Sequence, residues 1–121
     1  MKINLEKKGD VSVAHITGKL DTNTALFYEN EIFPLIDVQP EKNAAVQVST
    51  ALKLVLELQG MDYVSSAGLR VLIITAKKIK SKNGSLILSG MQKQIKNIFD
   101  ISGLSTIFQI VPSLEEALSK I

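Results

Sequence analysis

The chain has 121 residues, of which 45% are hydrophobic and 21% are charged, so it can form the core of one compact domain and is not disordered as a whole. The absence of cysteine and the presence of only one histidine, His15, exclude disulfide scaffolds, thiolate metal sites and most zinc sites. A formal net charge of +2, no tryptophan and 5% aromatic residues favour neither nucleic-acid binding nor a polybasic membrane surface. We therefore expect no metal, no cofactor and no direct nucleic-acid partner.

The first segment predicts a β-hairpin, because apolar and polar residues alternate on both sides of a turn at Gly9-Asp10. His15 shares a strand face with Val11 and Val13 and has no second ligand or nucleophile near it in sequence, so we interpret it as a partly buried strand residue. The N-terminus lacks the apolar core of a signal peptide, and no run of about 18 apolar residues occurs. These features predict a cytoplasmic protein without a membrane span.

A helix is predicted over residues 23–36, after the second strand ends at Gly18-Lys19-Leu20-Asp21. Asp21 or Thr22 can cap its start, and Pro34 is expected to break or kink its end. Its apolar residues available for burial are Ala25, Leu26, Ile32, Phe33 and Ile36.

The remaining segments alternate between strands and helices. Residues 37–50 are expected to form a long connection, in which residues 44–48 fit either a short strand or a turn of helix. The later elements are a strand at 52–58, a helix at 66–80, a strand at 85–88, a helix at 92–101, a strand at 108–111, and a terminal helix that Ser113 and Glu116 open as a capping box. The order β-β-α-β-α-β-α-β-α predicts an α/β fold: a mixed, largely parallel sheet with an opening hairpin and crossover helices.

Two serines stand between a buried strand and the start of an amphipathic helix, in the segment YVSSAGLR at residues 63–70. The simplest interpretation is an N-cap, in which Ser65 or Ser66 accepts hydrogen bonds from the next turn. A small hydrolase would use Ser66 as nucleophile and His15 as base, but Val64 stands where a nucleophile elbow needs glycine. A third use is phosphorylation, because a phosphate at a helix N-terminus meets oriented N–H groups and the positive end of the helix dipole.

The same helix carries apolar residues outside its main apolar stripe. Val71 and Ile74 are expected to point away from that stripe, beside Arg70, Lys77 and Lys78. Such residues are either wedged between neighbouring helices or exposed as a docking patch, and the sequence leaves both interpretations open.

Four segments, taken in order along the chain, resemble the STAS domain family, which is named after sulfate transporters and anti-sigma factor antagonists. The most specific is LVLELQGMDYVSSAGLRVLI at residues 54–73, and the others are GKLD at 18–21, FDISGL at 99–104 and SLEEAL at 113–118. The resemblance covers nearly the whole chain and implies a single STAS domain over residues 1–121. The chain differs from the family pattern in two places: the connection before residue 52 is longer, and Ser65 stands where the family often has aspartate.

In antagonists of this family, the resemblance implies, a serine at the start of the second helix is phosphorylated by an anti-sigma factor that is also a serine kinase. The unphosphorylated antagonist binds that kinase and so frees a sigma factor for transcription. When Gly68 and Leu69 are aligned with the family's Asp-Ser-Ser/Thr-Gly-Leu, Ser66 falls at the phosphoacceptor and Ala67 at the second hydroxyl position. A phosphatase that reverses the modification is a second implied partner.

We therefore predict a regulatory protein without enzymatic activity, which is phosphorylated at Ser66. The residues expected to contact the partner are Asp21, Thr22, Ser65, Ala67, Gly68, Arg70, Val71 and Ile74. The alternative function is that of a stand-alone STAS subunit in a membrane transport or lipid-trafficking complex, which would share the fold and need no phosphorylation.

Overall fold

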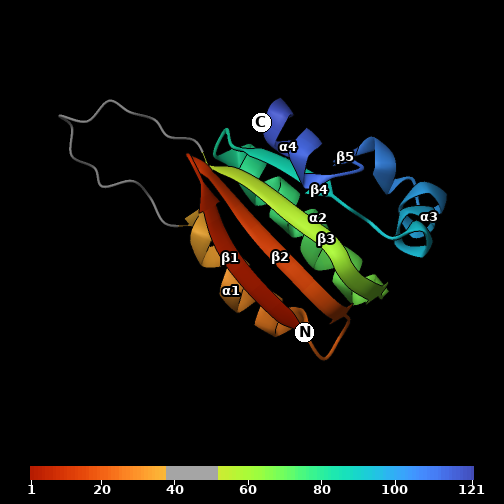
Figure 1. Ribbon diagram of the computed structural model, residues 1–121. Coiled ribbons are helices and arrows are strands. Elements are labelled where there is room, and N and C mark those ends of the chain that lie inside the picture. The colour runs from red at the N-terminus through yellow and green to blue at the C-terminus, as the bar shows by residue number, and fades with distance from the viewer. Residues whose placement is uncertain (38–51) are drawn as a thin grey trace.

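The strands lie in the sheet in the same order as they occur in the chain. The computed structural model describes residues 1–37 and 52–121 (Figure 1). The strands are β1 (Lys2–Lys8), β2 (Val11–Leu20), β3 (Lys53–Val64), β4 (Ser85–Ser89) and β5 (Gln109–Val111). The helices are α1 (Ala25–Asp37), α2 (Ser66–Ser81), α3 (Lys93–Ile101) and α4 (Leu114–Lys120), with a 3₁₀ turn, η1 (Leu104–Thr106), before β5. The predicted element order is confirmed, and the open question at 44–48 lies outside the described residues.

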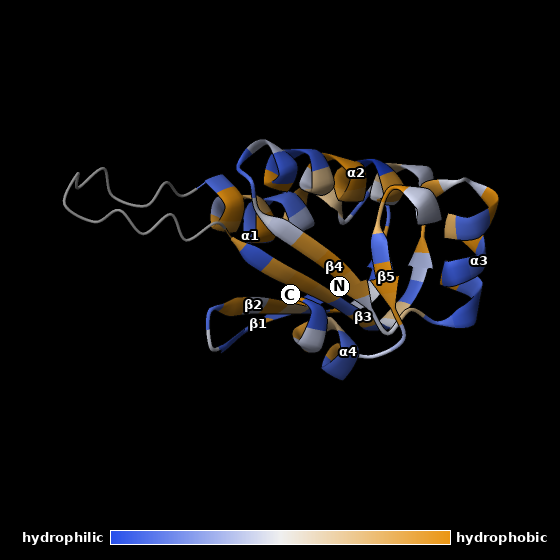
Figure 2. Ribbon diagram, turned by 90° about the horizontal axis from the view of Figure 1, so that it is seen from above, coloured by the Kyte–Doolittle hydropathy of each residue, from blue (hydrophilic) through white to orange (hydrophobic). Residues whose placement is uncertain are grey.

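The sheet is mixed because only the opening hairpin is antiparallel. Strand β1 pairs with β2 in antiparallel fashion, and the pairs β2–β3, β3–β4 and β4–β5 are parallel. Each parallel pair is joined by a helix, and these crossover helices cover one face of the sheet, whereas α4 lies on the other face (Figure 2). The carboxyl ends of β2 and β3 therefore meet at one edge, where α1 and α2 begin.

Two apolar clusters fill the two faces of the sheet. Alternation along β2 sends Ala14 and Ile16 to the larger cluster under the crossover helices, and Val11 and Val13 to the smaller cluster under α4. His15 is half-buried on the α4 face, as the alternation predicts. The smaller cluster consists of Val11, Val13, Val55, Ile87, Val111 and Ala117.

The structure corrects three predictions, which concern where β3 and α1 end and which residues of α1 are buried. Strand β3 does not end near residue 58 but continues to Val64, because its carboxyl half keeps pairing with β2 across a register shift. Helix α1 continues past Pro34 to Asp37, so the proline does not break it. Leu26 is 65% exposed, because the buried stripe of α1 is formed by Tyr28 and the residues four and eight positions later.

A buried hydrogen bond fixes α1 against α2. The hydroxyl of Thr75 donates to the carbonyl oxygen of Val71 at 2.7 Å, so it accepts from the Tyr28 hydroxyl at 2.8 Å. Burial raises the pKa of the Tyr28 phenol, and the hydrogen bond with Thr75 only partly opposes that shift. At the other end of the helix pair, Lys78 Nζ lies 3.1 Å from a carboxylate oxygen of Asp37. These contacts attach the middle and the carboxyl-terminal part of α2 to α1.

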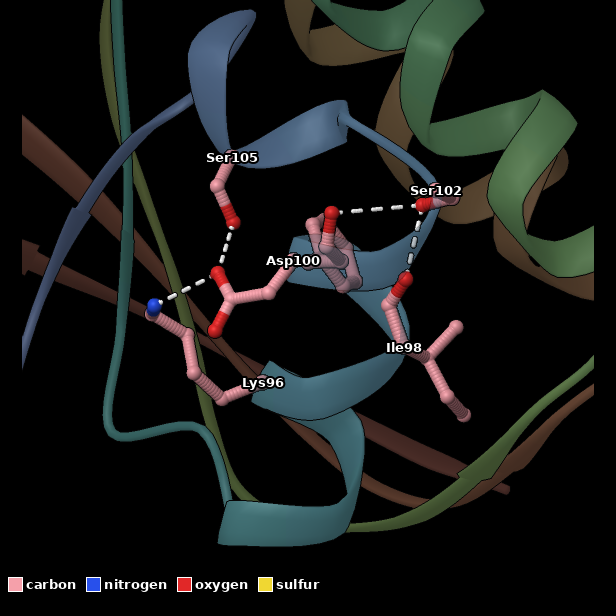
Figure 3. Close-up of polar contacts among 6 residues, drawn as sticks. Lys96, Ile98, Asp100, Ser102 and Ser105 are labelled. Carbon is pink, nitrogen blue, oxygen red and sulfur yellow. Dashed lines mark hydrogen bonds and ion pairs between the residues drawn. The ribbon is translucent and has the colours of Figure 1, made fainter.

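The segment FDISGL forms the end of α3 and the turn into η1. The Ser102 hydroxyl donates to the carbonyl oxygen of Ile98 at 2.7 Å, and the same oxygen accepts from the Ser102 amide at 3.0 Å at the end of the helix (Figure 3). The carboxylate of Asp100 accepts from Lys96 Nζ at 2.8 Å and from the Ser105 hydroxyl, so it links α3 to η1 (Figure 3).

This linkage predicts a small pH dependence of stability. Hydrogen bonds from Lys96 and then Ser105 hold the pKa of Asp100 below its ordinary value of 3.8. A lowered pKa in the folded state stabilises the fold at pH values above 3.8, and this contribution disappears as the pH falls through the lowered value. In urea denaturation, Asp100→Asn should be less stable than wild type at neutral pH and should match it at about pH 2. The difference should shrink in a Lys96→Met background, and a gap that stays constant with pH would contradict this account.

Candidate functional site

The starts of α1 and α2 lie next to each other at the carboxyl edge of the sheet. Leu20 pairs with Val64 as the last residues of β2 and β3, and the next amide, that of Ser65, donates to the carbonyl oxygen of Leu20 at 3.0 Å. This bond connects the chain just before α2 to the chain just before α1. Because the strands are parallel, both helices begin at this edge and present their N-termini there.

Ser65, and not Ser66, is the N-cap of α2. Its backbone is extended (φ −98°, ψ 178°), and its hydroxyl accepts from the amide of Gly68 at 3.3 Å. Its carbonyl oxygen also accepts the first helical hydrogen bond, from Leu69 N at 2.8 Å. The N-cap interpretation of the sequence is therefore confirmed for Ser65, whose side chain is used for this structural role.

Ser66 is the first residue of α2, and it is exposed. Its hydroxyl makes no hydrogen bond within the part of the chain that the structure describes. The first turn of α2 contains no acidic residue, so no carboxylate within that turn offsets the positive end of the helix dipole. Arg70 is exposed one turn later, at the spacing that places side chains on the same helix face. The environment of Ser66 therefore suits an added negative charge.

Asp21 caps α1 in the same region. Its carboxylate accepts from the amides of Asn23 at 2.9 Å and Thr24 at 3.2 Å, and the Thr24 hydroxyl accepts in return from the Asp21 amide at 2.9 Å. This reciprocal arrangement is a capping box with threonine in the place of the usual glutamate. Asp21 is half-buried and Thr22 is exposed beside it. The structure thus shows a capping role for Asp21 and leaves Thr22 accessible.

Gly68 allows α2 to start close to the end of β2. A Cβ atom at this position would overlap the carbonyl oxygen of Leu20 and would lie 2.8 Å from Cγ2 of Val64. Gly68 is buried, so the prediction that it contacts a partner is replaced by a packing role. Ala67 and Ser65 are half-buried at the same helix start.

The structure also corrects the prediction for Val71. Its side chain is 3% exposed and belongs to the larger core cluster, so it does not point away from the core and is not available to a partner in this conformation. The wedged interpretation holds for Val71, because α1 packs along this side of α2. Ile74 is half-buried and Arg70 is exposed, so both are accessible.

Three exposed apolar side chains at this end of the molecule were not predicted as site residues. Leu26 and Phe27 lie in the first turn of α1, and Tyr63 lies at the end of β3, with exposed fractions of 65%, 44% and 48%. Lys19 Nζ lies 5.9 Å from the centre of the Tyr63 ring. The spacing of Tyr28, Ile32 and Ile36 could have identified the first two, because it fixes the buried stripe and leaves Leu26 and Phe27 outside it.

The hydrolase interpretation of Ser66 is not compatible with the fold. His15 lies on the sheet face that α4 covers, whereas Ser66 begins a helix that covers the opposite face. The sheet therefore separates the two side chains. Over residues 1–37 and 52–121, no group of three or more His, Asp or Glu side chains is arranged to hold a metal ion.

Comparison with known proteins identifies the family. The family described as the STAS domain matches residues 2–117. The chain belongs to the STAS domain family. This STAS domain is 30% identical over 117 residues to BtrV of Bordetella bronchiseptica, a candidate anti-sigma factor antagonist, with 97% of this chain and 91% of that protein covered. It is also 30% identical over 113 residues to the anti-sigma-B factor antagonist of Bacillus subtilis, with 91% and 92% covered.

A solved structure shows the same arrangement of elements. The crystal structure of an anti-sigma factor antagonist from Mycobacterium paratuberculosis superposes on this STAS domain with a TM-score of 0.78 and 25% sequence identity, and 99% of this chain and 92% of that chain are covered. Within the described residues, the STAS domain contains no helix that is both long and apolar enough to cross a membrane.

Proposed function

We propose that this STAS domain is an anti-sigma factor antagonist whose binding to an anti-sigma factor with serine kinase activity is switched by phosphorylation of Ser66. The proposal rests on one observation: the two adjacent serines have different structural roles. The hydroxyl of Ser65 caps α2, whereas that of Ser66 is exposed and unbonded among the described residues. A kinase can therefore modify Ser66 without removing a hydrogen bond that holds the helix.

The helix start tolerates a phosphate. A phosphoserine carries about −1.5 to −2 charges at neutral pH, and a negative charge near a helix N-terminus gains about 0.3–1 kcal/mol. Arg70 is exposed one turn along α2 and can pair with the phosphate oxygens. The modification is thus expected to leave the fold intact and to change only the surface that the partner meets.

The partner surface surrounds this serine. We propose that it includes the accessible residues predicted from the sequence, together with the exposed apolar side chains that the structure adds. These residues are Asp21, Thr22, Leu26, Phe27, Tyr63, Ser65, Ser66, Ala67, Arg70 and Ile74. Two of the added side chains, Phe27 and Tyr63, are aromatic, and aromatic residues are enriched at protein–protein interfaces. The proposed cycle is completed by a phosphatase that restores the unmodified serine.

Phosphosite mapping tests the assignment. The partner is first recovered from the native host by pull-down, then incubated with the STAS domain and ATP, and the product is mapped by mass spectrometry. Phosphate is expected on Ser66 in wild type and in Ser65→Ala, which lacks the capping hydroxyl, and is expected to be absent from Ser66→Ala. Stable phosphate on Ser65, or modification of Ser66→Ala, would contradict the assignment. Recovery of transport subunits without a kinase would support the alternative function instead.

A further inference from the structure

A cavity of about 630 Å³ lies on the α4 face of the sheet, opposite the face that carries Ser66. Its floor is formed by the middle of β2 and β3, and its wall by Gly90 and the start of α4. The lining residues are His15, Ile16, Thr17, Glu57, Gln59, Gly60, Gly90, Pro112, Ser113 and Leu114. The volume is within the range of about 300–1,000 Å³ that is typical of small-molecule sites. The cavity lies beside the carboxyl ends of β4 and β5, which Gly90 and Pro112 follow.

A buried carboxylate lines this cavity. Glu57 is only 8% exposed. One of its oxygens accepts from the Gln59 amide at 2.6 Å, and the other accepts from the Ser89 hydroxyl at 3.0 Å. Each carboxylate oxygen can accept a second hydrogen bond, so the group retains acceptor capacity toward the cavity.

No cation of the described residues forms an ion pair with Glu57. Its register partner on β2 is His15, but the Nε2 atom of His15 lies 3.4 Å from a carboxylate oxygen of Glu6 on the other side. Buried carboxylates are normally paired with a positive group, because a charge removed from water is costly when it is unpaired. Glu57 therefore has hydrogen bonds that orient it and lacks a charge that neutralises it.

Gly90 keeps the approach to this carboxylate free of side-chain atoms. It follows β4 with φ +72°, and a Cβ atom there would lie 2.7 and 2.8 Å from the two Glu57 oxygens. Any other residue at position 90 would displace the carboxylate. The backbone at Gly90 thus passes directly beside the Glu57 carboxylate, and both residues line the cavity.

The start of α4 does not provide the missing positive charge. The helix has only seven residues, the Ser113 hydroxyl accepts from the Glu116 amide at 3.2 Å, and Glu115 and Glu116 occupy its first turn. The capping bond and these carboxylates offset the partial positive charge of the helix end. The cavity therefore has a negative centre at Glu57, and an anion is not the ligand that it favours.

We propose that this cavity binds a small organic cation, with an ammonium group that donates to the Glu57 carboxylate and an aliphatic part that lies against Pro112 and Leu114. An ammonium group supplies both the charge and the hydrogen-bond donors that the carboxylate lacks. The site is on the opposite face of the sheet from Ser66, so its existence does not depend on the phosphorylation switch.

The test compares three probes of equal length that differ in charge: n-butylammonium, n-butanol and n-butyrate. Each is titrated into the ¹⁵N-labelled chain, and the amide chemical shifts of Gln59, Gly60 and Gly90 are followed by NMR. The amide of Ser66, on the opposite face of the sheet, is the control that should not shift. Butylammonium should shift the lining amides saturably, most of all Gln59, whose N–H donates to Glu57. Shifts of equal size and saturation with butanol or butyrate, or no saturable shift with butylammonium, would overturn the proposal.

Two variants and one control assign the effect to Glu57. Glu57→Gln keeps an acceptor and a donor for its two partners and should weaken butylammonium binding at least tenfold. Glu116→Gln makes the same charge change outside the cavity and should bind like wild type. Gln59→Trp fills the cavity from an exposed position without touching the backbone bond to Glu57, and it should weaken binding even if Glu57→Gln fails to fold. Wild-type affinity in Gln59→Trp, or in a folded Glu57→Gln, would overturn the assignment.

Discussion

Ser66→Asp is expected to weaken binding of the proposed kinase partner at least tenfold and to leave the melting temperature nearly unchanged. The partner that covers an uncharged serine must bury a carboxylate in the variant, and an unpaired buried charge costs several kcal/mol. Tenfold in affinity corresponds to about 1.4 kcal/mol, so even partial burial reaches that threshold. Within the free protein the side chain is exposed at the start of α2, where an acidic residue is favourable, so the fold is not weakened. Calorimetric titration into the partner measures the first effect, and thermal unfolding measures the second.

Ser66→Asn is the matched control, because it has nearly the shape of aspartate and no charge. It should bind more tightly than Ser66→Asp, and Ser66→Ala should bind like wild type and resist release by ATP. Equal affinities for wild type and Ser66→Asp would mean that the partner does not cover this position. The proposed switch at Ser66 would then be wrong, and any regulation would lie elsewhere on the molecule.

The second large effect is expected at Gly68, two residues further along. Gly68→Ala should lower the free energy of unfolding by about 1–3 kcal/mol, because the new Cβ atom overlaps the Leu20 carbonyl and crowds Val64. Helix propensity alone predicts the opposite sign, since alanine stabilises a helix interior by about 1 kcal/mol relative to glycine. The close approach of two backbone segments should decide the outcome, because neither of them can move without disturbing the sheet.

Urea denaturation of Gly68→Ala and Arg70→Ala tests this expectation. Arg70 is exposed on the same helix, so its truncation should change stability by no more than about 0.5 kcal/mol. Because Gly68 fixes the distance between the starts of α1 and α2, Gly68→Ala should also reduce partner binding in the fraction that remains folded. An increase in stability would show that the contact with Leu20 is loose and that Gly68 does not set the position of α2.

The element order and the family could be predicted from the sequence because they depend on local patterns. Alternation around Gly9-Asp10 and the helical spacing after Ser66 are properties of neighbouring residues, and the structure contains both elements. The length of β3 was missed for a physical reason: residues 59–64 extend only because they pair with β2, and that pairing is long-range. The burial of Val71 was also missed because it depends on a long-range contact. The apolar stripe of α2 indicates which side faces the sheet, but it does not indicate that α1 covers a second side of the helix.

The candidate site was predictable in position but not in detail. Two adjacent serines before a helix can both act as caps, and their sequence does not decide between them. The hydrogen bond from Ser65 N to Leu20 O accompanies the extended backbone at Ser65, so the cap falls there and Ser66 becomes the first helical residue. The cavity around Glu57 left a weaker signal, a single acidic residue within the apolar strand LKLVLEL. Its burial, and the lack of a cation beside it among the described residues, became apparent only from the packing of β4 and α4 around it.

The most direct test of the switch is the affinity of the phosphorylated protein itself. The chain is phosphorylated with the proposed kinase partner, purified away from it, and titrated calorimetrically into fresh partner beside the unmodified chain. We expect the phosphorylated form to bind at least tenfold more weakly, a loss of about 1.4 kcal/mol or more, and phosphatase treatment to restore the original affinity. Equal affinities of the two forms, with phosphate verified on Ser66, would contradict the account.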